Sequence, residues 1–247
     1  MSTRYLVGIH AVREALRARA ALRFVAVSRE RHDPRLQELI TLAHAARVPL
    51  RRVGVAELER WAGRTPHQGV VAEAEAKPVL ELEDLLADAP QRLLLALDGI
   101  EDPHNLGAIV RSACGAGVDG VLLPARRAAG LTETVERVSA GALEHVRVAR
   151  VGNLAQALEQ CKQAGFWIVG LDGEGPTRLW EHDFRDPTVL VVGAEGRGLH
   201  ALIRQRCDAR VAIPLAAGVD SLNASVAAGI ALFEIARQRG GDTRPTG

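Results

Sequence analysis

The sequence has few cysteines, and their arrangement excludes two common kinds of structural site. The 3 cysteines are Cys114, Cys161 and Cys207, and no two of them form a CxxC pair. This spacing suits neither a disulfide framework nor a zinc site, and it favours a reducing cytoplasm. The histidines also lack metal-ligand spacing, so no metal is expected.

Long hydrophobic runs and aromatic residues are scarce as well. No apolar segment approaches the roughly 20 residues that a helix needs to cross a bilayer, so no membrane association is expected. The first residues lack the basic and then apolar pattern of a secretory signal, which favours a cytoplasmic protein. Aromatic residues make up 3% of the chain, too few for a surface that stacks many bases. If RNA is bound, charge and shape must supply most of the affinity.

Lysine is almost absent, because 29 of the 31 basic residues are arginine. This bias suits bidentate phosphate recognition, and it suits a GC-rich genome equally well. Residues 1–75 carry 13 arginines and 8 acids, a net charge of +5, whereas the remainder carries 18 basic and 22 acidic residues, a net charge of −4. The candidate ligands of RNA phosphates in the basic part are Arg13, Arg17, Arg19, Arg51 and Arg52. A solvated helix face explains these arginines as well.

The first 75 residues read as a small α/β domain. Helical spacing occurs over residues 9–20, 34–47 and 55–61, and strand character over 23–28, 49–53 and 69–74. An acidic segment that closes at Pro90 then predicts a linker carrying one helix. We therefore predict a first domain over residues 1–76, a linker over 77–90 and a second domain over 91–247.

The second domain alternates wholly apolar strands with helices. The predicted strands are 93–97, 120–123, 166–170, 189–192 and 209–213; the predicted helices are 105–117, 132–141, 153–164, 198–206 and 223–238. Strands that are apolar on both faces indicate a parallel sheet covered by helices. Ligands of such sheets bind where strands end and helices begin, and three strand ends here carry polar clusters.

The first of these corners follows Asp98. Asn105 is predicted to cap the next helix. Helical side chains lean toward the N-terminus, so Arg111 should project over a surface that Gly107 leaves bare, back toward the corner. An ordinary capped helix with a solvent-facing arginine is the alternative.

The second corner, residues 193–198, contains three glycines together with Glu195. Glycines allow backbone N–H groups to approach a ligand closely. The spacing is G-x-x-G-x-G and lies late in the chain, so it matches the dinucleotide fingerprint G-x-G-x-x-G poorly. A plain glycine-rich turn is the alternative.

The third corner is the longest, with ten residues from 214 to 223 between a strand and a helix. A loop of this length inside a compact domain is usually a binding loop. Asn223 is predicted to cap the closing helix, and Ser225 fits an ordinary helix start. Ser221 and Asn223 are the better functional candidates.

Together the three corners form an ordered set of motifs. They read Asn105-x-Gly107-x-x-x-Arg111, Gly193-Ala-Glu195-Gly, and Ile213-Pro followed by Ser221-Leu-Asn223-x-Ser225. In these motifs the chain resembles the SpoU/TrmH class of RNA ribose 2′-O-methyltransferases, which belongs to the SPOUT superfamily. Residues 8–12 and 65–70 look like the substrate-binding domain of that class, which is similar to ribosomal protein L30e. The resemblance covers nearly the whole chain.

The resemblance implies a fold that periodicity could not show. It implies an α/β protein whose C-terminal parallel-sheet SPOUT domain contains a deep trefoil knot, preceded by a small L30e-like domain. Patterning alone predicts an open doubly wound sheet, because chains are rarely knotted. The class further implies S-adenosylmethionine as cofactor, a homodimer with its site near the subunit interface, and large-subunit ribosomal RNA as partner. The member most like this chain methylates one guanosine in the peptidyl-transferase region.

The same resemblance implies roles for individual residues. The catalytic set is Arg111, Asn105, Glu195, Ser221 and Asn223, and the cofactor contacts are Gly193, Ile213 and Leu222. The class assigns proton removal from the 2′-hydroxyl to the motif-one arginine. A guanidinium stays protonated, so orienting the hydroxyl or its phosphate is the alternative role. Another ribosomal or transfer RNA nucleotide as substrate, and a non-catalytic RNA-binding relative, also stay open.

Overall fold

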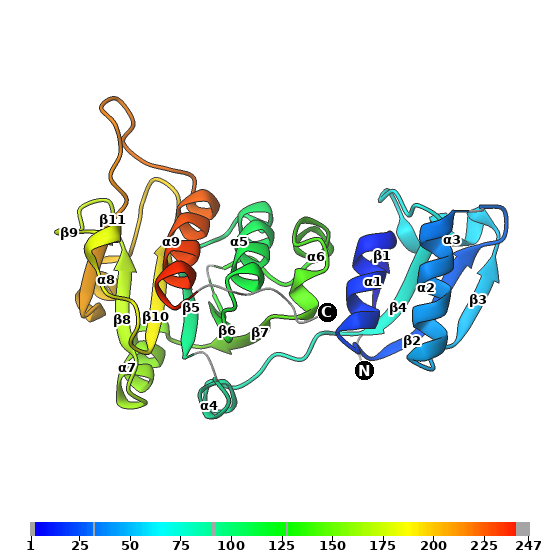
Figure 1. The fold of residues 1–247 in the computed structure, drawn as a ribbon, viewed down its shortest axis with the longest axis horizontal. Coiled ribbons are helices and arrows are strands. Elements are labelled where there is room, and N and C mark those ends of the chain that lie inside the picture. Colours follow the sequence, from blue (N-terminus) through cyan, green and yellow to red (C-terminus); the bar gives the residue numbers. More distant parts are fainter. Residues whose placement is uncertain (1–2, 32, 90–91, 127, 241–247) are drawn as a thin grey trace. The chain divides into compact units, whose positions relative to one another are not determined.

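The computed structural model describes residues 3–31, 33–89, 92–126 and 128–240 (Figure 1). Its contacts divide the chain into two compact units. The first unit comprises Met1–Pro78 and Leu131–His145, and the second comprises Val79–Gly130 and Val146–Gly247. Pro90 and Gln91, where the predicted linker gives way to the second domain, lie outside the described residues.

The first unit contains a mixed sheet between two helical layers. Its elements are β1 (Thr3–Val7), α1 (Ile9–Arg17), β2 (Leu22–Ser28), α2 (Pro34–Ala45), β3 (Leu50–Val53), α3 (Val55–Ala62) and β4 (Val70–Glu75). The strand order is β1-β4-β2-β3, with β2 and β3 parallel and the other pairs antiparallel. Alternate strand residues face opposite sides, so Val25 and Val27 pack with α1 and α2, whereas Phe24 and Ala26 pack with α3.

A later segment also belongs to the first unit. It carries α6 (Glu133–Val138) and the short 3₁₀ helix η1 (Ala142–Glu144). Arg4 of β1 pairs with both, at 2.5 Å from Nη1 to Glu136 Oε1 and 2.8 Å from Nη2 to Glu144 Oε1. These side chains are largely shielded from water. Removal of either partner would leave the other charge buried and unpaired, which destabilises the fold.

The second unit contains a seven-stranded parallel sheet. Its strands are β5 (Leu93–Asp98), β6 (Gly120–Pro124), β7 (Arg147–Val151), β8 (Trp167–Leu171), β9 (Thr177–Arg178), β10 (Thr188–Gly193) and β11 (Ala209–Ala212). They follow the order β7-β6-β5-β10-β8-β11-β9, and all neighbouring pairs are parallel. The predicted parallel sheet is confirmed.

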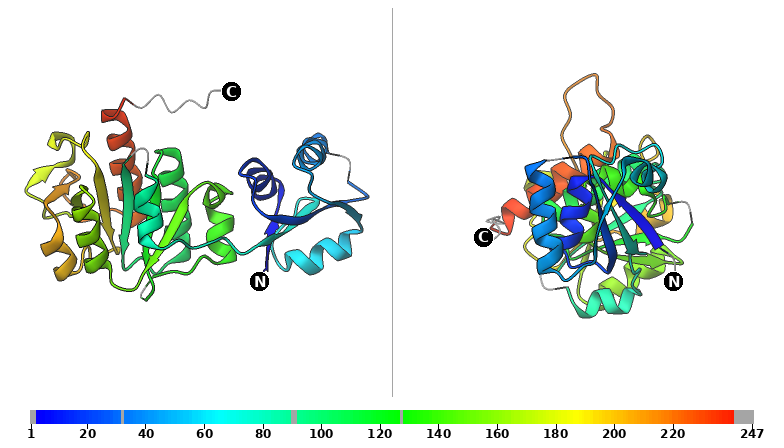
Figure 2. Two further views of the ribbon diagram at one scale, coloured as in Figure 1. Left: turned by 90° about the horizontal axis from the view of Figure 1, so that it is seen from below. Right: turned by 90° about the vertical axis from the view of Figure 1, so that its right-hand side faces the viewer.

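Helices cover both faces of this sheet (Figures 1 and 2). They are α4 (Leu82–Ala87), α5 (Pro103–Gly115), α7 (Leu154–Gln163), η2 (Leu179–Glu181), α8 (Ala201–Arg206) and α9 (Ala224–Gln238). Helices α4, α7 and α8 pack in one core cluster with Val189 and Val191 of β10. Helix α9 packs against β8, β10 and α5 on the opposite face.

Three strands were not predicted from the sequence, namely β1, β7 and β9. Strand β7 carries Arg147 and Arg150 at the sheet edge, so it lacks the wholly apolar pattern of the inner strands. Strand β9 is only two residues long. Among the described residues, no helix is long and apolar enough to span a membrane, and no group of His, Cys, Asp and Glu is arranged to hold a metal ion. Strand order does not test the trefoil knot, which stays a prediction.

Candidate active site

The three polar corners meet at one edge of the seven-stranded sheet. They follow β5, β10 and β11; β5 and β10 are neighbours in the sheet, and β8 lies between β10 and β11. One residue of each corner enters a single hydrogen-bonded group. Asn223 Nδ2 donates to Asn105 Oδ1 at 2.9 Å and to Glu195 Oε2 at 2.8 Å. The structure therefore brings together three residues that lie as far as 118 positions apart.

Asn223 is held in place by its second role as a helix cap. Its Oδ1 accepts from the Ser225 backbone N–H at 2.9 Å and from Ser225 Oγ at 2.6 Å, which confirms the predicted cap of α9. The carbonyl end of the side chain is thus committed to the helix, and the amide end faces the site. This division fixes the orientation of the amide, as a preorganised site requires.

The predicted cap by Asn105 is wrong. Asp102 caps α5, because its carboxylate accepts from the His104 backbone N–H at 2.9 Å and Pro103 occupies the first helical position. Aspartate caps as well as asparagine, and proline favours the first turn, so the helix begins earlier than expected. Asn105 therefore lies inside the first turn, where its side chain accepts from Asn223.

Gly193 is required by the fold of its own turn. A Cβ at this position would lie 2.2 Å from the carbonyl carbon of Gly198 and 2.6 Å from the Leu199 nitrogen. The turn doubles back on the strand end, where the Gly198 N–H donates to the Ala194 carbonyl at 2.8 Å. Gly196 adopts a φ of +74°, which is in the left-handed region that favours glycine. The backbone conformation of this turn therefore accounts for its glycines, and their presence does not by itself require a ligand.

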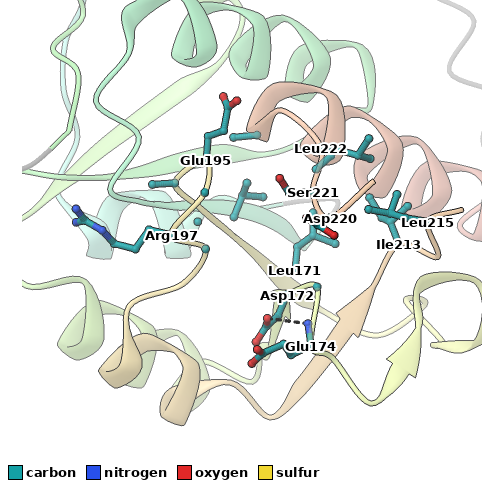
Figure 3. Close-up of a pocket in the computed structure, with 18 of the residues that line it drawn as sticks. Leu171, Asp172, Glu174, Glu195, Arg197, Ile213, Leu215, Asp220, Ser221 and Leu222 are labelled. Atoms are coloured by element: carbon teal, nitrogen blue, oxygen red, sulfur yellow. Dashed lines mark hydrogen bonds between the residues drawn. The ribbon is translucent and has the colours of Figure 1, made fainter. Parts of the chain in front are cut away.

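A cavity of about 380 Å³ opens beside this turn (Figure 3). Five predicted site residues line it: Gly193, Glu195, Ile213, Ser221 and Leu222. Asp172 and Glu174 lie at one end of the cavity and Glu195 at the other, with Ile213, Leu215 and Leu222 along a third side. The volume is within the about 300–1,000 Å³ of small-molecule sites.

A fourth corner, after β8, was missed in the sequence. Asp172 is only 6% exposed, and its Oδ2 lies 3.1 Å from Arg204 Nε and 3.1 Å from Arg210 Nη1. Arg204 also pairs with Glu174 at 3.0 Å. The signal was present, because Asp172 follows directly on an apolar strand, as the other corners do.

This first cavity combines apolar surface with negative charge. Its ionisable lining is Asp172, Glu174, Glu195 and Asp220 against Arg197 and Arg204, four carboxylates and two guanidiniums. Leu171, Ile213 and Leu222 supply apolar surface. Such a lining complements a ligand with an apolar body and a cationic group.

A second cavity of about 400 Å³ adjoins the hydrogen-bonded group from the side of α5. It is lined by Gly99, Ile100, Glu101, Asp102, Asn105, Ala194, Glu195 and Arg197. Glu195, Ala194 and Arg197 line both cavities. Beneath them, buried Asp98 accepts from the His200 backbone N–H at 2.7 Å and pairs with His200 Nδ1 at 2.9 Å, which ties β5 to the start of α8.

Arg111 lies apart from these groups. It is exposed, makes no hydrogen bond or ion pair with any residue that the structure describes, and lines neither cavity. The predicted bare surface at Gly107 is wrong, because Gly107 is a buried residue of α5, the helix that α9 packs against.

Comparisons with known proteins agree with this arrangement. The model of the SpoU rRNA methylase family matches residues 92–233, and that of an RNA 2′-O ribose methyltransferase substrate-binding domain matches residues 5–80. The 23S rRNA (guanosine-2′-O-)-methyltransferase RlmB of Pseudomonas aeruginosa is 45% identical over 94% of this chain and 95% of its own.

Two solved structures are similar in fold. The SpoU methyltransferase AviRb from Streptomyces viridochromogenes, in complex with the cofactor AdoMet, has a TM-score of 0.78 at 28% identity and covers 96% of this chain and 90% of its own. The A. aeolicus TrmH/SpoU tRNA modifying enzyme has a TM-score of 0.56 at 34% identity, over 67% of this chain and 85% of its own. Since one family model alone spans more than half of the sequence, the chain belongs to the SpoU rRNA methylase family.

Proposed function

We propose that the protein is an S-adenosylmethionine-dependent methyltransferase that modifies the ribose 2′-oxygen of a guanosine in 23S ribosomal RNA. The observation that carries the proposal is the hydrogen-bonded group of Asn105, Asn223 and Glu195, which stands between two adjoining cavities. A transfer reaction needs two ligands held with their reacting atoms aligned, and a fixed polar group between two cavities suits that need.

The first cavity, beside the glycine turn after β10, fits the cofactor. S-adenosylmethionine supplies an electrophilic methyl group on a positively charged sulfur when it is bound. Gly193, Ile213 and Leu222 would hold its apolar parts with backbone and aliphatic groups. The excess of carboxylates in the lining complements the positive charge of the sulfonium. Ser221 lines the same cavity and offers a hydroxyl to polar atoms of the ligand.

The second cavity would hold the target nucleotide. Glu195 lines both cavities, so its carboxylate can accept a hydrogen bond from the 2′-hydroxyl while Asn223 holds it in place. Arg197 makes no ion pair with any described residue and lines the same cavity, where it can bind a phosphate. These residues would orient the hydroxyl toward the cofactor side.

Arg111 would act from a second copy of the chain. It lines neither cavity of its own subunit, yet it lies on α5 beside α9, and α9 exposes Val226 and Phe233 at 49% and 53%. A homodimer through this α5–α9 face would cover the apolar side chains and carry Arg111 to the partner's site. There its permanent positive charge would stabilise the negative charge that develops on the 2′-oxygen as the hydroxyl proton passes to the Glu195 carboxylate.

Ribosomal rather than transfer RNA is favoured as substrate by the extent of the matches. The tRNA modifying relative covers 67% of this chain, whereas the 23S rRNA methyltransferase covers 94%. The first unit, which matches a substrate-binding family, therefore distinguishes the two kinds of relative. We place the target in the peptidyl-transferase region and the reaction in the bacterial cytoplasm.

The test is methyl transfer from labelled S-adenosylmethionine to large-subunit ribosomal RNA from a strain that lacks this gene, followed by mapping of the modified position. One 2′-O-methylguanosine in the peptidyl-transferase region is expected. Transfer to a different nucleotide or to transfer RNA would reject the substrate, and cofactor binding without any transfer would reject the enzyme. Mixing Arg111→Ala protein with Glu195→Gln protein tests the dimer, since recovery of up to a quarter of wild-type activity is expected only if Arg111 acts in the partner's site.

A further inference from the structure

A third cavity lies in the first unit, and of the functional candidates discussed above only Arg52 lines it. It has a volume of about 410 Å³, and its lining comes from the ends of the parallel strands β2 and β3 and from the beginning of α2. Its lining is Val27, Ser28, Arg29, Arg31, Asp33, Pro34, Leu36, Gln37, Ile40 and Arg52. The carboxyl ends of parallel strands are the usual place for a ligand in an α/β sheet. We call it the strand-end cavity.

Three arginines give the strand-end cavity its charge. Arg29 Nε donates to the backbone carbonyl of Arg52 at 2.7 Å, which ties the ends of the two strands together. The Arg52 guanidinium has no hydrogen bond or ion pair with any described residue, and Arg31 lies 3.6 Å from Asp33 in a loose pair. Asp33 is engaged by Arg35, through contacts of 3.1 Å to Oδ1 and 2.9 Å to Oδ2. The lining therefore presents guanidinium groups whose charge no carboxylate fully offsets.

Three other arginines that the sequence suggested as phosphate ligands are already occupied. Arg17 pairs with Glu14 at 3.3 Å and with Glu38 at 3.5 Å, and Arg13 lies within 4.0 Å of the same two acids. The Arg51 guanidinium lies 3.8 Å from the centre of the Phe24 ring. Of the arginines that the sequence suggested as phosphate ligands, only Arg52 lines the strand-end cavity.

The same cavity has an apolar wall formed by Val27, Pro34, Leu36 and Ile40. A nucleotide presents the matching chemistry, because it joins an anionic phosphate to a flat base with apolar faces. Bases that leave an RNA helix are held by stacking on aromatic rings or on guanidinium planes. The aromatic side chains of the first unit pack together, Trp61 with both Tyr5 and Phe24, so the aliphatic wall is the surface left for a base in the strand-end cavity.

We propose that the strand-end cavity binds one unpaired nucleotide of the RNA substrate, with its phosphate on Arg31 and Arg52 and its base against the aliphatic wall. This inference rests on the proposed function for the identity of the ligand as RNA. It adds a second point of attachment for the RNA, separate from the site of methyl transfer.

The experiment compares two charge-matched double variants of the full-length protein. Arg31→Gln/Arg52→Gln removes the two cavity arginines, and Arg23→Gln/Arg60→Gln removes two exposed arginines that face Glu73 and Trp61 instead. Binding to an unmodified large-subunit rRNA fragment is measured by fluorescence anisotropy over a range of salt concentrations. The cavity variant should bind about tenfold more weakly, and its log Kd against log salt slope should fall by about 0.7, the value for one lost single-strand phosphate contact. The control should change less than twofold.

A second measurement identifies the bound form of RNA. A short single-stranded oligonucleotide should compete with the rRNA fragment better than a duplex of the same sequence, and this advantage should vanish in the cavity variant. Gln37→Glu offers a milder test, since it places a carboxylate in the cavity and keeps a good helix former. It should weaken binding in the same direction, and circular dichroism should show an unchanged fold.

The results separate this inference from the proposed function. Equal loss of binding in both double variants would overturn the cavity as a site and leave only diffuse charge, as would equal competition by duplex RNA or by an acidic peptide. A wild-type protein that binds rRNA through the cavity yet transfers no methyl group would support this inference and reject the proposed function. At saturating RNA the cavity variant should keep the wild-type kcat, and a lower kcat would also count against a pure binding role.

Discussion

The two units both open a cavity at the carboxyl ends of parallel strands, and the two cavities are built differently. In the second unit, polar side chains from three corners hydrogen-bond to one another, and a glycine turn closes against its own strand. In the first unit, arginines line an open cavity, and the guanidinium of Arg52 has no partner among the described residues. The polar groups of the second unit are therefore preorganised, whereas the arginines of the first unit stay available to a ligand.

This difference matches two kinds of task. Chemistry needs groups held to within a fraction of an ångström, so its side chains must be fixed by their neighbours. Attachment of a flexible polyanion needs charge that can adapt, because phosphate contacts position RNA without demanding one geometry. Substitutions should therefore act on turnover in the second unit and on RNA affinity in the first.

The largest effect is expected at Arg111. Arg111→Ala should lower the single-turnover methylation rate by about 10²–10⁴, because the charge that stabilises the developing oxyanion is lost. Arg111 lies outside both cavities, so the affinity for S-adenosylmethionine, measured by calorimetry, should stay within about twofold. A variant with near-normal turnover would end the assignment of Arg111 to the reaction.

Gly193 tests the rigid turn. Gly193→Ala places a methyl group 2.2 Å from the Gly198 carbonyl carbon, so the turn must open, at a cost of about 1–3 kcal/mol by analogy with overpacked cores. Thermal unfolding should report the lost stability, and cofactor affinity should fall with it. Gly152→Ala is the matched control, because a Cβ there meets nothing within 4 Å. Equal behaviour of the two variants would show that the turn tolerates the change.

The fold could be predicted from the sequence where burial dictated the pattern. Strands β5 and β10 are buried along their whole length, so their apolar runs are unambiguous. Strand β7 was missed because it carries polar residues and so lacks the continuous apolar run of an inner strand. Strand β1 was missed because most of its residues are partly exposed and apolar and polar residues do not alternate along it. The grouping of Leu131–His145 with the first unit reflects contacts of α6 with β1 and of η1 with α1, which no local pattern encodes.

The candidate site, like the fold, could be predicted from the sequence only in part. Glycine and polar residues after apolar strands correctly indicated which corners meet, since parallel strands share one carboxyl edge. Which residue caps a helix was less certain, because Asp102 and Asn105 both have suitable side chains. The state of each arginine could not be predicted, because the partners Glu14 and Glu38 come from different helices that only the folded chain brings together.

A smaller effect separates the two roles of Asn223. Asn223→Asp keeps the cap of α9, because aspartate caps a helix as well as asparagine does. It removes the amide donor and sets a carboxylate beside Glu195, now 2.8 Å from Asn223 Nδ2. We expect kcat to fall about tenfold, as when a hydrogen bond to a charged group is lost, with little change in the melting temperature. Asn223→Ser, which also caps but adds no charge, should lose less, and a larger loss with serine would contradict charge repulsion as the cause.

The smallest effect should come from removing an acid that offsets arginine charge in the first unit. Glu38 lies 3.5 Å from Arg17 and 4.0 Å from Arg13, with its side chain 43% exposed. Glu38→Gln frees these arginines from one acid, and an exposed ion pair is worth at most about 1 kcal/mol. RNA affinity should therefore rise less than about fivefold, equally for single-stranded and duplex RNA, and the gain should fade as salt is raised. A gain confined to single strands would mean that the α1–α2 face also recognises unpaired nucleotides, and the contrast between occupied and available arginines would then fail.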